Sequence, residues 1–157
     1  MSGQEVTFHL YQPFPSIELS YPEYVVRTAI DEDVEKDFLE ILSDAFGPPA
    51  MTHDLFLLDL DEGWYTRGDC LVLYNDKIPL AAGQVRVGES DADSIGFLDT
   101  LGVPKAYQNH GYGIEMTKRR IIALVERGVT EIRSEVEADN HQMQTILQKL
   151  GFATKAT

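Results

Sequence analysis

The sequence predicts a mixed α/β fold in a single domain, and three observations support this prediction. The chain has 157 residues, 43% of them hydrophobic, which suits one compact domain with a sizeable core. Apolar residues recur at every second position in some segments and at every third or fourth position in others. Along the chain these patterns give the order strand, two helices, three strands, helix, strand and helix.

The N-terminal part predicts strands. Residues 6–10 alternate apolar and polar side chains, and residues 17–19 repeat this pattern after two prolines. We expect two short strands here, ahead of a further strand near residues 24–28.

Two helices are expected next. Asp31 can cap the first, whose end is marked by Gly47 and two prolines. Its apolar stripe would consist of Val34, Phe38, Ile41, Leu42 and Ala45. A second helix is expected over residues 51–60, followed by a loop that contains the only tryptophan, Trp64.

The middle of the chain predicts a hairpin and a central strand. Residues 71–74 and 80–87 are strand-like and flank a turn at residues 75–77. Residues 88–91 would turn the chain into the central strand, an apolar run over residues 95–103 that Pro104 ends.

A glycine-bearing turn follows the central strand. Gly111 and Gly113 stand directly before apolar residues at helical spacing, so they should lie at a helix N-terminus. The free backbone N–H groups and the positive end of the helix dipole make such a turn a natural phosphate site. A tight turn without a ligand is the alternative.

The end of the chain predicts a strand and a final helix. Residues 131–137 alternate, as in a strand with one solvated face, and Asp139 or Asn140 can cap the helix. The apolar stripe of this helix would be Met143, Ile146, Leu147 and Leu150. Gly151 stands where a left-handed C-terminal cap belongs.

Charge and composition exclude several classes of partner. The net charge of −13 argues against nucleic acid and anionic membranes, because both require cationic surface. It is compatible with a cationic substrate, and equally with a role in solubility alone. The N-terminus has no signal-peptide pattern and no long apolar run follows, so we expect a cytoplasmic protein. Cys70 should be a buried thiol, which leaves no disulfide or zinc site.

Two motifs resemble the GNAT superfamily of N-acyltransferases. Leu101-Gly102-Val103 followed by Gln108-x-x-Gly111-x-Gly113 is similar to its acetyl-CoA signature, Gln/Arg-x-x-Gly-x-Gly/Ala after a strand. Asn140 also stands eleven residues before Gly151-Phe152, as in the family's Asn…Gly-Phe segment.

The resemblance implies a fold and its extent. One GNAT-like domain would span residues 1–157, with a family-like core over residues 23–152 and an atypical strand extension over residues 1–22. The family's sheet is mixed and mostly antiparallel, with splayed central strands and about four flanking helices.

The resemblance also implies acetyl-CoA as the acyl donor. In the opening between the splayed strands, the pantetheine arm would bond to the backbone of Leu101, Gly102 and Val103, with Asn140 reaching the cofactor from the last helix. The pyrophosphate would lie on the turn formed by Gln108, Asn109, His110, Gly111, Tyr112 and Gly113. Asn109 and His110 replace the family's frequent Gly and Arg/Lys, although asparagine tolerates a left-handed backbone.

In this family an amine attacks the thioester carbonyl directly, so the resemblance implies an amine acceptor and a base for its proton. Asp99 lies two residues before Leu101, with the same facing, where several relatives carry an acidic base. An aspartate in water has a pKa of about 3.9, so this role requires burial or an intervening water. A purely structural carboxylate is the alternative. The Val103 N–H is the expected donor to the thioester oxygen.

The sequence departs from the family at two places. Leu147 stands where many active relatives have a tyrosine that protonates the departing thiolate. Without this tyrosine, the reaction should be slower by about 10²-fold or more. Only residues 153–157 follow the Gly-Phe pair, whereas the family continues with further strands. Either the N-terminal strands or the partner subunit of a homodimer would then fill that place.

The sequence therefore predicts an N-acetyltransferase that transfers an acetyl group from acetyl-CoA to a primary amine of a small molecule or peptide. A weak or inactive acyl-CoA-binding sensor or scaffold is the alternative, and an interaction domain whose turn binds nothing is a third. Phe46, Met51, His53 and Trp64 lie near the family's acceptor site, but core packing explains them equally well and they receive no role.

Overall fold

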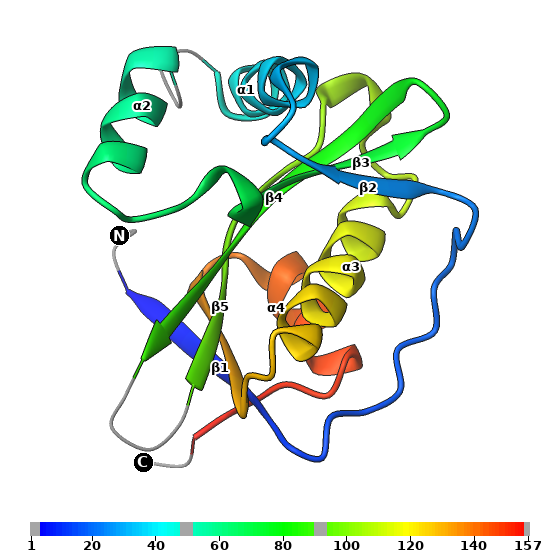
Figure 1. The fold of residues 1–157 in the computed structure, drawn as a ribbon. Helices are drawn as coiled ribbons and strands as arrows, with labels where there is room; N and C mark the ends of the chain where they lie inside the picture. Colours follow the sequence, from blue (N-terminus) through cyan, green and yellow to red (C-terminus); the bar gives the residue numbers. More distant parts are fainter. Residues whose placement is uncertain (1–3, 48–51, 90–93, 156–157) are drawn as a thin grey trace.

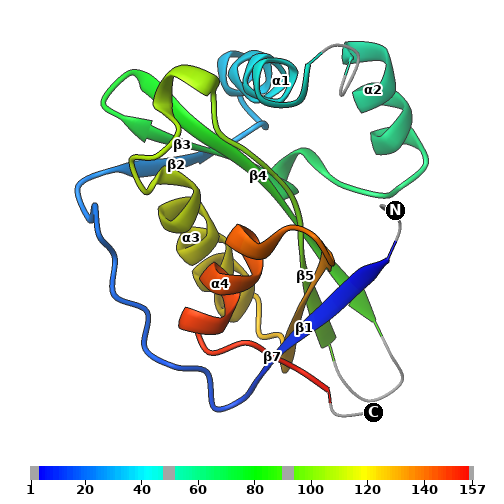
Figure 2. The same ribbon diagram turned by 180° about the vertical axis from the view of Figure 1, so that it is seen from behind.

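A computed structural model of the chain describes residues 4–47, 52–89 and 94–155, which form one seven-stranded sheet with helices on both faces (Figures 1 and 2). The strands are β1 (Glu5–Tyr11), β2 (Val25–Thr28), β3 (Cys70–Asn75), β4 (Ile78–Glu89), β5 (Ser94–Gly102), β6 (Glu131–Glu137) and β7 (Ala153–Thr154). The helices are α1 (Glu32–Phe46), α2 (His53–Asp61), α3 (Tyr112–Glu126) and α4 (His141–Lys149), with short 3₁₀ turns at Arg67–Asp69 and Lys105–Tyr107.

The sheet has the order β2-β3-β4-β5-β6-β1-β7. Only β5 and β6 pair in parallel, and every other neighbouring pair is antiparallel. The expected mixed, mostly antiparallel sheet with four flanking helices is therefore confirmed.

Alternation along β3 divides the core between the two faces of the sheet. Leu71 and Leu73 pack with α3 and α4 on one face, whereas Cys70, Val72 and Tyr74 pack with α1 on the other. All five side chains are buried, as expected for a strand covered on both faces. The predicted buried thiol at Cys70 is confirmed.

The two central strands splay. Their pairing covers only three positions and ends at Phe97 opposite Arg133, although β5 continues to Gly102 and β6 to Glu137. Beyond this point the backbone edges of the two strands face an opening instead of each other. The predicted splayed central strands are confirmed.

A bulge interrupts β5 just as it leaves its neighbour. On β4 only Gln84 lies between the two flanking pairs, whereas Asp99 and Thr100 both lie between them on β5. Two residues opposite one define a bulge, which bends the strand and re-aims its side chains. This bulge lies immediately before Leu101, where the pantetheine segment was expected to begin.

The N-terminal extension forms one strand instead of two. β1 runs antiparallel to β6 over its whole length, and the short β7 pairs with the far side of β1. β1 thus occupies the sheet position beyond β6. The predicted strand at residues 17–19 is wrong: Ser20 and Tyr21, which follow it, donate their N–H groups to the Glu115 carboxylate of α3.

Several element ends differ from the predictions. α2 begins at His53, after the side chain of Thr52 caps it, and Met51 lies outside the described residues. β4 extends through Gly88 to Glu89, so these two residues belong to the strand and not to the expected turn, whose other residues lie outside the described part of the chain.

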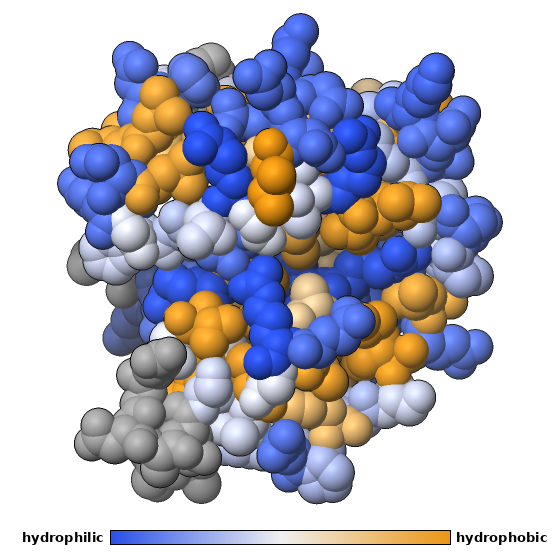
Figure 3. Space-filling model, viewed as in Figure 1, coloured by the Kyte–Doolittle hydropathy of each residue, from blue (hydrophilic) through white to orange (hydrophobic). Residues whose placement is uncertain are grey.

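The rest of the protein covers only part of α2. Figure 3 shows apolar residues gathered near this helix, where three leucines are exposed: Leu55, Leu57 and Leu58.

Candidate active site

The turn between β5 and α3 has the backbone shape expected of it. Gly111 is the N-cap of α3 and has a left-handed conformation, with φ of 83°. Asn109 is also left-handed, with φ of 69°, in agreement with the tolerance expected of asparagine. The Gln108 side chain donates to the Val103 carbonyl over 3.1 Å and so ties the turn to the end of β5. Among the described residues, no side chain caps the first N–H groups of α3, so they remain available to a ligand.

A cavity of about 500 Å³ lies along this turn, between the N-termini of α3 and α4. It brings together nine of the predicted cofactor residues: Leu101, Gly102, Val103, Gln108, Asn109, Gly111, Tyr112, Gly113 and Asn140. His110 does not line it. The His110 ring stacks against Tyr112 on the exposed side of the turn, and its carbonyl accepts a hydrogen bond from the Tyr21 hydroxyl.

Asn140 has a structural role that leaves part of its side chain available. It is the N-cap of α4, and its Oδ1 accepts a hydrogen bond from the Met143 N–H over 3.1 Å. Its Nδ2 group can still donate two hydrogen bonds into the cavity. Capping and ligand binding are therefore compatible at this residue.

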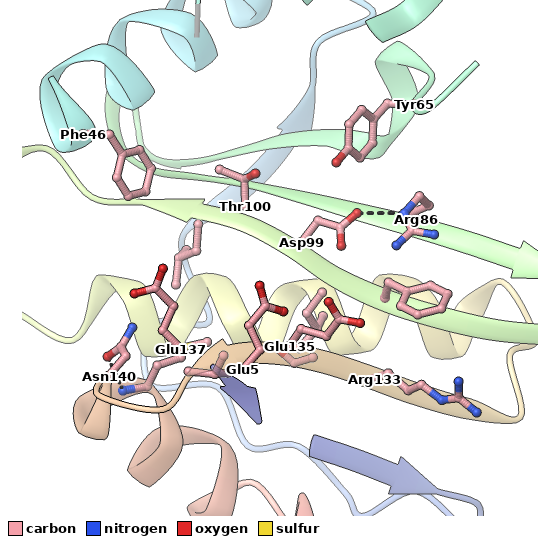
Figure 4. Close-up of a pocket in the computed structure, with 16 residues that line it drawn as sticks. Glu5, Phe46, Tyr65, Arg86, Asp99, Thr100, Arg133, Glu135, Glu137 and Asn140 are labelled. Carbon is pink, nitrogen blue, oxygen red and sulfur yellow. Dashed lines mark hydrogen bonds and ion pairs between the residues drawn. The ribbon is translucent and has the colours of Figure 1, made fainter. Parts of the chain in front are cut away.

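A second cavity of about 580 Å³ continues from the first across the bulge of β5. The two share four lining residues, Phe46, Leu101, Asn140 and Met143. Its remaining walls come from β1, β4, β5, β6 and the loop after α2 (Figure 4). The two cavities therefore meet at the splayed end of the central strands.

Asp99 lies in this second cavity, paired with a cation. Its Oδ2 accepts a hydrogen bond from Arg86 Nε over 3.0 Å, and the Arg86 guanidinium stacks on the Phe97 ring at 4.1 Å. The loop after α2 adds Tyr65 (Figure 4). Burial, together with the negative charge of nearby Asp99, raises the pKa of the Tyr65 hydroxyl to about 12. Tyr65 therefore remains a neutral donor at neutral pH.

Three glutamates form the opposite wall. Figure 4 shows Glu5, Glu135 and Glu137 projecting from β1 and β6 toward the space in front of β5. Glu5 lies directly opposite Glu137 in the register of the two strands. The pKa of the Glu5 carboxyl is raised, first by a hydrogen bond with Glu135 and by the negative charge of that residue. Burial and the charge of Glu137 raise it further. Among the described residues, none of these three carboxylates forms an ion pair.

Several acceptor-side residues were missed or left unassigned in the sequence analysis. Phe46 lines both cavities, whereas Trp64 is exposed and His53 contacts Glu35 at the surface. Tyr65 was not considered, because nothing local distinguishes it within its loop. Glu135 and Glu137 were recognised only as part of the solvated face of a strand.

Leu147, which replaces the family's tyrosine, is fully buried in the core between α4 and the sheet. It lines neither cavity.

Within residues 4–47, 52–89 and 94–155, no helix is both long and apolar enough to span a bilayer. The same described residues contain no cluster of three or more His, Cys, Asp or Glu side chains placed to hold a metal ion.

Comparison with known proteins gives relatives of the same kind. Mycothiol acetyltransferase of Kocuria rhizophila is 27% identical over 146 residues, which cover 87% of this chain and 48% of that protein. A GCN5-related N-acetyltransferase structure from Sphaerobacter thermophilus superimposes with a TM-score of 0.73 at 18% identity, covering 96% of this chain and 48% of that one. The chain thus spans about half the length of both proteins.

Two shorter solved structures match this chain over most of their own length. An aminoglycoside 6'-N-acetyltransferase from Acinetobacter haemolyticus has a TM-score of 0.62 at 20% identity, covering 85% of this chain and 94% of the other. A chain of the NatC complex bound to Gag peptide and CoA has a TM-score of 0.67 at 16% identity, covering 85% and 87%. At such identities the likeness shows the fold alone.

The family profile described as "Acetyltransferase (GNAT) family" matches residues 35–152. This match runs from α1 to the residue before β7, and it includes the glycine turn, the bulged strand β5 and the cap of α4. It covers well over half of the chain, so the chain belongs to the GNAT acetyltransferase family.

Proposed function

We propose that this chain is an acetyl-CoA-dependent N-acetyltransferase whose acceptor is a primary amine that carries additional positive charge. The single observation that supports this most is the meeting of two cavities at the bulge of β5. One is lined by the glycine turn and Asn140, and the other by Asp99 and three glutamates, Glu5, Glu135 and Glu137. A donor and an acceptor placed in these cavities would meet beside Leu101.

The donor side relies on backbone groups. The free N–H groups at the start of α3 would bind the pyrophosphate, helped by the positive end of the helix dipole. Beyond the last β5–β6 pair, the backbone of Leu101 to Val103 has no partner on β6 and would hydrogen-bond to the pantetheine arm. Asn140 would contribute its Nδ2 group from the cap of α4.

The reaction requires one bond to form and one to break. The amine nitrogen attacks the thioester carbonyl carbon, the C–S bond breaks, and the thiolate of CoA departs. Asp99 would accept the amine proton, directly or through water, while the Val103 N–H stabilises the charge that develops on the carbonyl oxygen. Tyr65, whose hydroxyl stays neutral beside Asp99, would orient the incoming amine by accepting a hydrogen bond from its N–H.

The acceptor's charge is inferred from the glutamate wall. Arg86 is engaged with Asp99 and Arg133 with Glu131, so the cations of this cavity are already paired. A hydrogen bond with Glu135, together with the negative charges of Glu135 and Glu137, raises the pKa of Glu5, and a cation bound between these carboxylates would offset their charge. A diamine or polyamine suits this wall, since one nitrogen can react while a second remains protonated.

A second candidate function is an acyl-CoA-binding sensor with little or no turnover. The buried Leu147 favours it, because the family's usual proton donor to the leaving thiolate is absent from that position. A thiol has a pKa of about 8.5 and is a tolerable leaving group without an acid, so slow catalysis is still expected under the first proposal.

The test combines calorimetry with a thiol-release assay. Wild-type protein is titrated with acetyl-CoA and then incubated with matched diamines and monoamines of equal length while released CoA is measured. Cys70 is fully buried, so the protein should contribute little background to a thiol reagent. Binding with faster release for the diamine supports the proposal. Binding without release across the panel favours the sensor, and absence of binding contradicts both.

A further inference from the structure

We infer that Arg120, a buried arginine of α3, is a positioning residue that holds the bulge of β5 in the shape required by the active site. This inference rests on the proposed function for its effect on catalysis. Its structural part concerns the free protein and can be measured without any substrate.

The guanidinium of Arg120 is aimed at the bulge. The residue is fully buried, and its Nη1 lies 3.0 Å from the Asp99 carbonyl oxygen, 3.4 Å from that of Thr100 and 3.3 Å from that of Gln84. These are the same three residues at which the pairing of β4 and β5 changes register. One side-chain nitrogen therefore lies within hydrogen-bond distance of the carbonyl oxygen of each residue in the bulge.

The energetics explain why a charged residue stands here. A bulge leaves backbone groups without ladder partners, and a buried carbonyl without a donor is unfavourable. A buried guanidinium is itself unfavourable unless it is hydrogen-bonded, and among the described residues Arg120 has no carboxylate partner. Burial lowers its pKa to about 10, so Arg120 remains cationic at neutral pH. Each group thus offsets part of the other's burial, and only Arg120 Nε of the guanidinium is without a hydrogen-bond partner among the described residues.

The surroundings are shaped around this side chain. A Cβ atom added at Gly83 would lie 2.8 Å from Arg120 Cδ, so only glycine leaves room for the arginine at that position of β4. Arg120 Nη2 also donates to the Thr117 hydroxyl over 3.3 Å, and that hydroxyl donates to the Gly113 carbonyl over 2.8 Å. Arg120 therefore links the bulge to the first turn of α3.

This network lies under both halves of the site. The bulge directs the Asp99 side chain into the acceptor cavity and sets the path of the next residues, where the thioester would bind. Through Thr117, the same guanidinium contacts the helix turn that would bind the pyrophosphate. Arg120 lines neither cavity, so it acts through the residues it holds and not by touching the substrates.

The test replaces the arginine and separates local from general effects. Arg120→Met removes the charge and keeps an apolar stem, and Arg120→Lys keeps the charge with fewer donors. Lys118→Met is the control, because it removes a partly buried cation of the same helix that donates to Ser20 and not to the bulge. Hydrogen–deuterium exchange is measured on each free protein. We expect amides of residues 99–103 to exchange about tenfold faster in Arg120→Met, with β3 unchanged. Arg120→Lys should recover part of the protection.

Kinetics supply the second readout. A misplacement of about 1 Å can lower a rate by about 10²-fold, so kcat should fall by that order in Arg120→Met while KM changes little. Gly83→Ala, which displaces the side chain without removing its charge, should act in the same direction and also serves if Arg120→Met fails to fold. Unchanged exchange at residues 99–103, or equal acceleration across the whole sheet, would overturn the inference. Faster exchange confined to residues 99–103, in a protein whose wild type never releases CoA, would support the structural role of Arg120 and contradict the proposed function.

Discussion

The two halves of the opening between β5 and β6 are built in different ways. The donor half comes mostly from the continuous stretch between Leu101 and Gly113, and its proposed ligand contacts are largely backbone groups. The acceptor half is assembled from separate segments spread between Glu5 and Met143, and its chemistry lies in side chains such as Asp99 and Tyr65. A backbone site tolerates sequence change around it, whereas a side-chain site changes with each substitution. Within one fold, the donor half can therefore stay constant while the acceptor half varies.

The strongest way to break this comparison is to block the donor half. In Gly113→Trp, the new side chain would start between Val103 and Leu101, whose nearest atoms lie 3.6 and 3.8 Å from a Cβ at that position. The indole should fill the cavity and lower acetyl-CoA affinity by about 10³-fold, or about 4 kcal/mol. Calorimetry on folded protein measures this. Glu126→Trp, at the exposed end of the same helix, is the matched control and should bind normally.

The next largest effect should come from the acceptor half. Asp99→Asn keeps the size of the side chain but cannot accept the amine proton, so kcat should fall by about 10²-fold to 10³-fold. Acetyl-CoA binding should remain within twofold of wild type, because Asp99 does not line the donor cavity. Arg86→Gln removes the ion-pair partner and leaves the carboxylate in place. If the two variants lose equal activity, the pair is structural and Asp99 is not the base.

The same difference explains what could be predicted from the sequence. The glycine turn, the start of α3 and the cap of α4 depend on local backbone geometry, which glycine and asparagine reveal at short range. The glutamate wall depends on the pairing of Glu5 with Glu137, residues at opposite ends of the chain. No local pattern shows which distant strand β1 will join. The donor site was therefore accessible to sequence reasoning, and the acceptor wall was not.

Two errors have more specific causes. Residues 17–19 alternate like a strand, but the residues that follow them donate hydrogen bonds to Glu115 of α3. This tertiary contact, which the local pattern does not show, determines the path of the chain there. Arg120 was overlooked within the basic run of α3. Its spacing, four residues from both Met116 and Leu124, places it on the buried stripe of that helix, and this signal could have identified it.

A third prediction sharpens the comparison by changing only charge in the acceptor half. The double variant Glu135→Gln with Glu137→Gln should raise KM for a diamine by about tenfold, since a cation loses two nearby carboxylates in a partly exposed site. KM for a monoamine of equal length should change less than twofold, and acetyl-CoA affinity should not change. Glu126→Gln, which removes a charge far from the cavity, is the control. Equal effects on both amines would exclude recognition of a second positive charge.

The smallest expected effect concerns Glu131, which lies on the same face of β6 but away from the cavity. Burial raises the pKa of its carboxyl, but hydrogen bonds from Arg133 and His9 outweigh burial, so the pKa lies below its ordinary value of 4.5. A depressed pKa contributes stability above pH 4.5 that is lost as the pH falls through the lower folded-state value. Glu131→Gln should therefore reduce the free energy of unfolding by about 1 kcal/mol at pH 7, and by less as the pH falls below that range. Denaturant unfolding across this pH range measures the convergence. Glu131 joins β6 to β1 through His9, and it also pairs with Arg133, which lines the acceptor cavity. Its loss should therefore leave acetyl-CoA affinity and KM for the monoamine unchanged, and the unpaired Arg133 should raise KM for the diamine by less than the double glutamate variant does. An equal rise in KM for both amines would show that Glu131 acts on the shape of the cavity and not through charge.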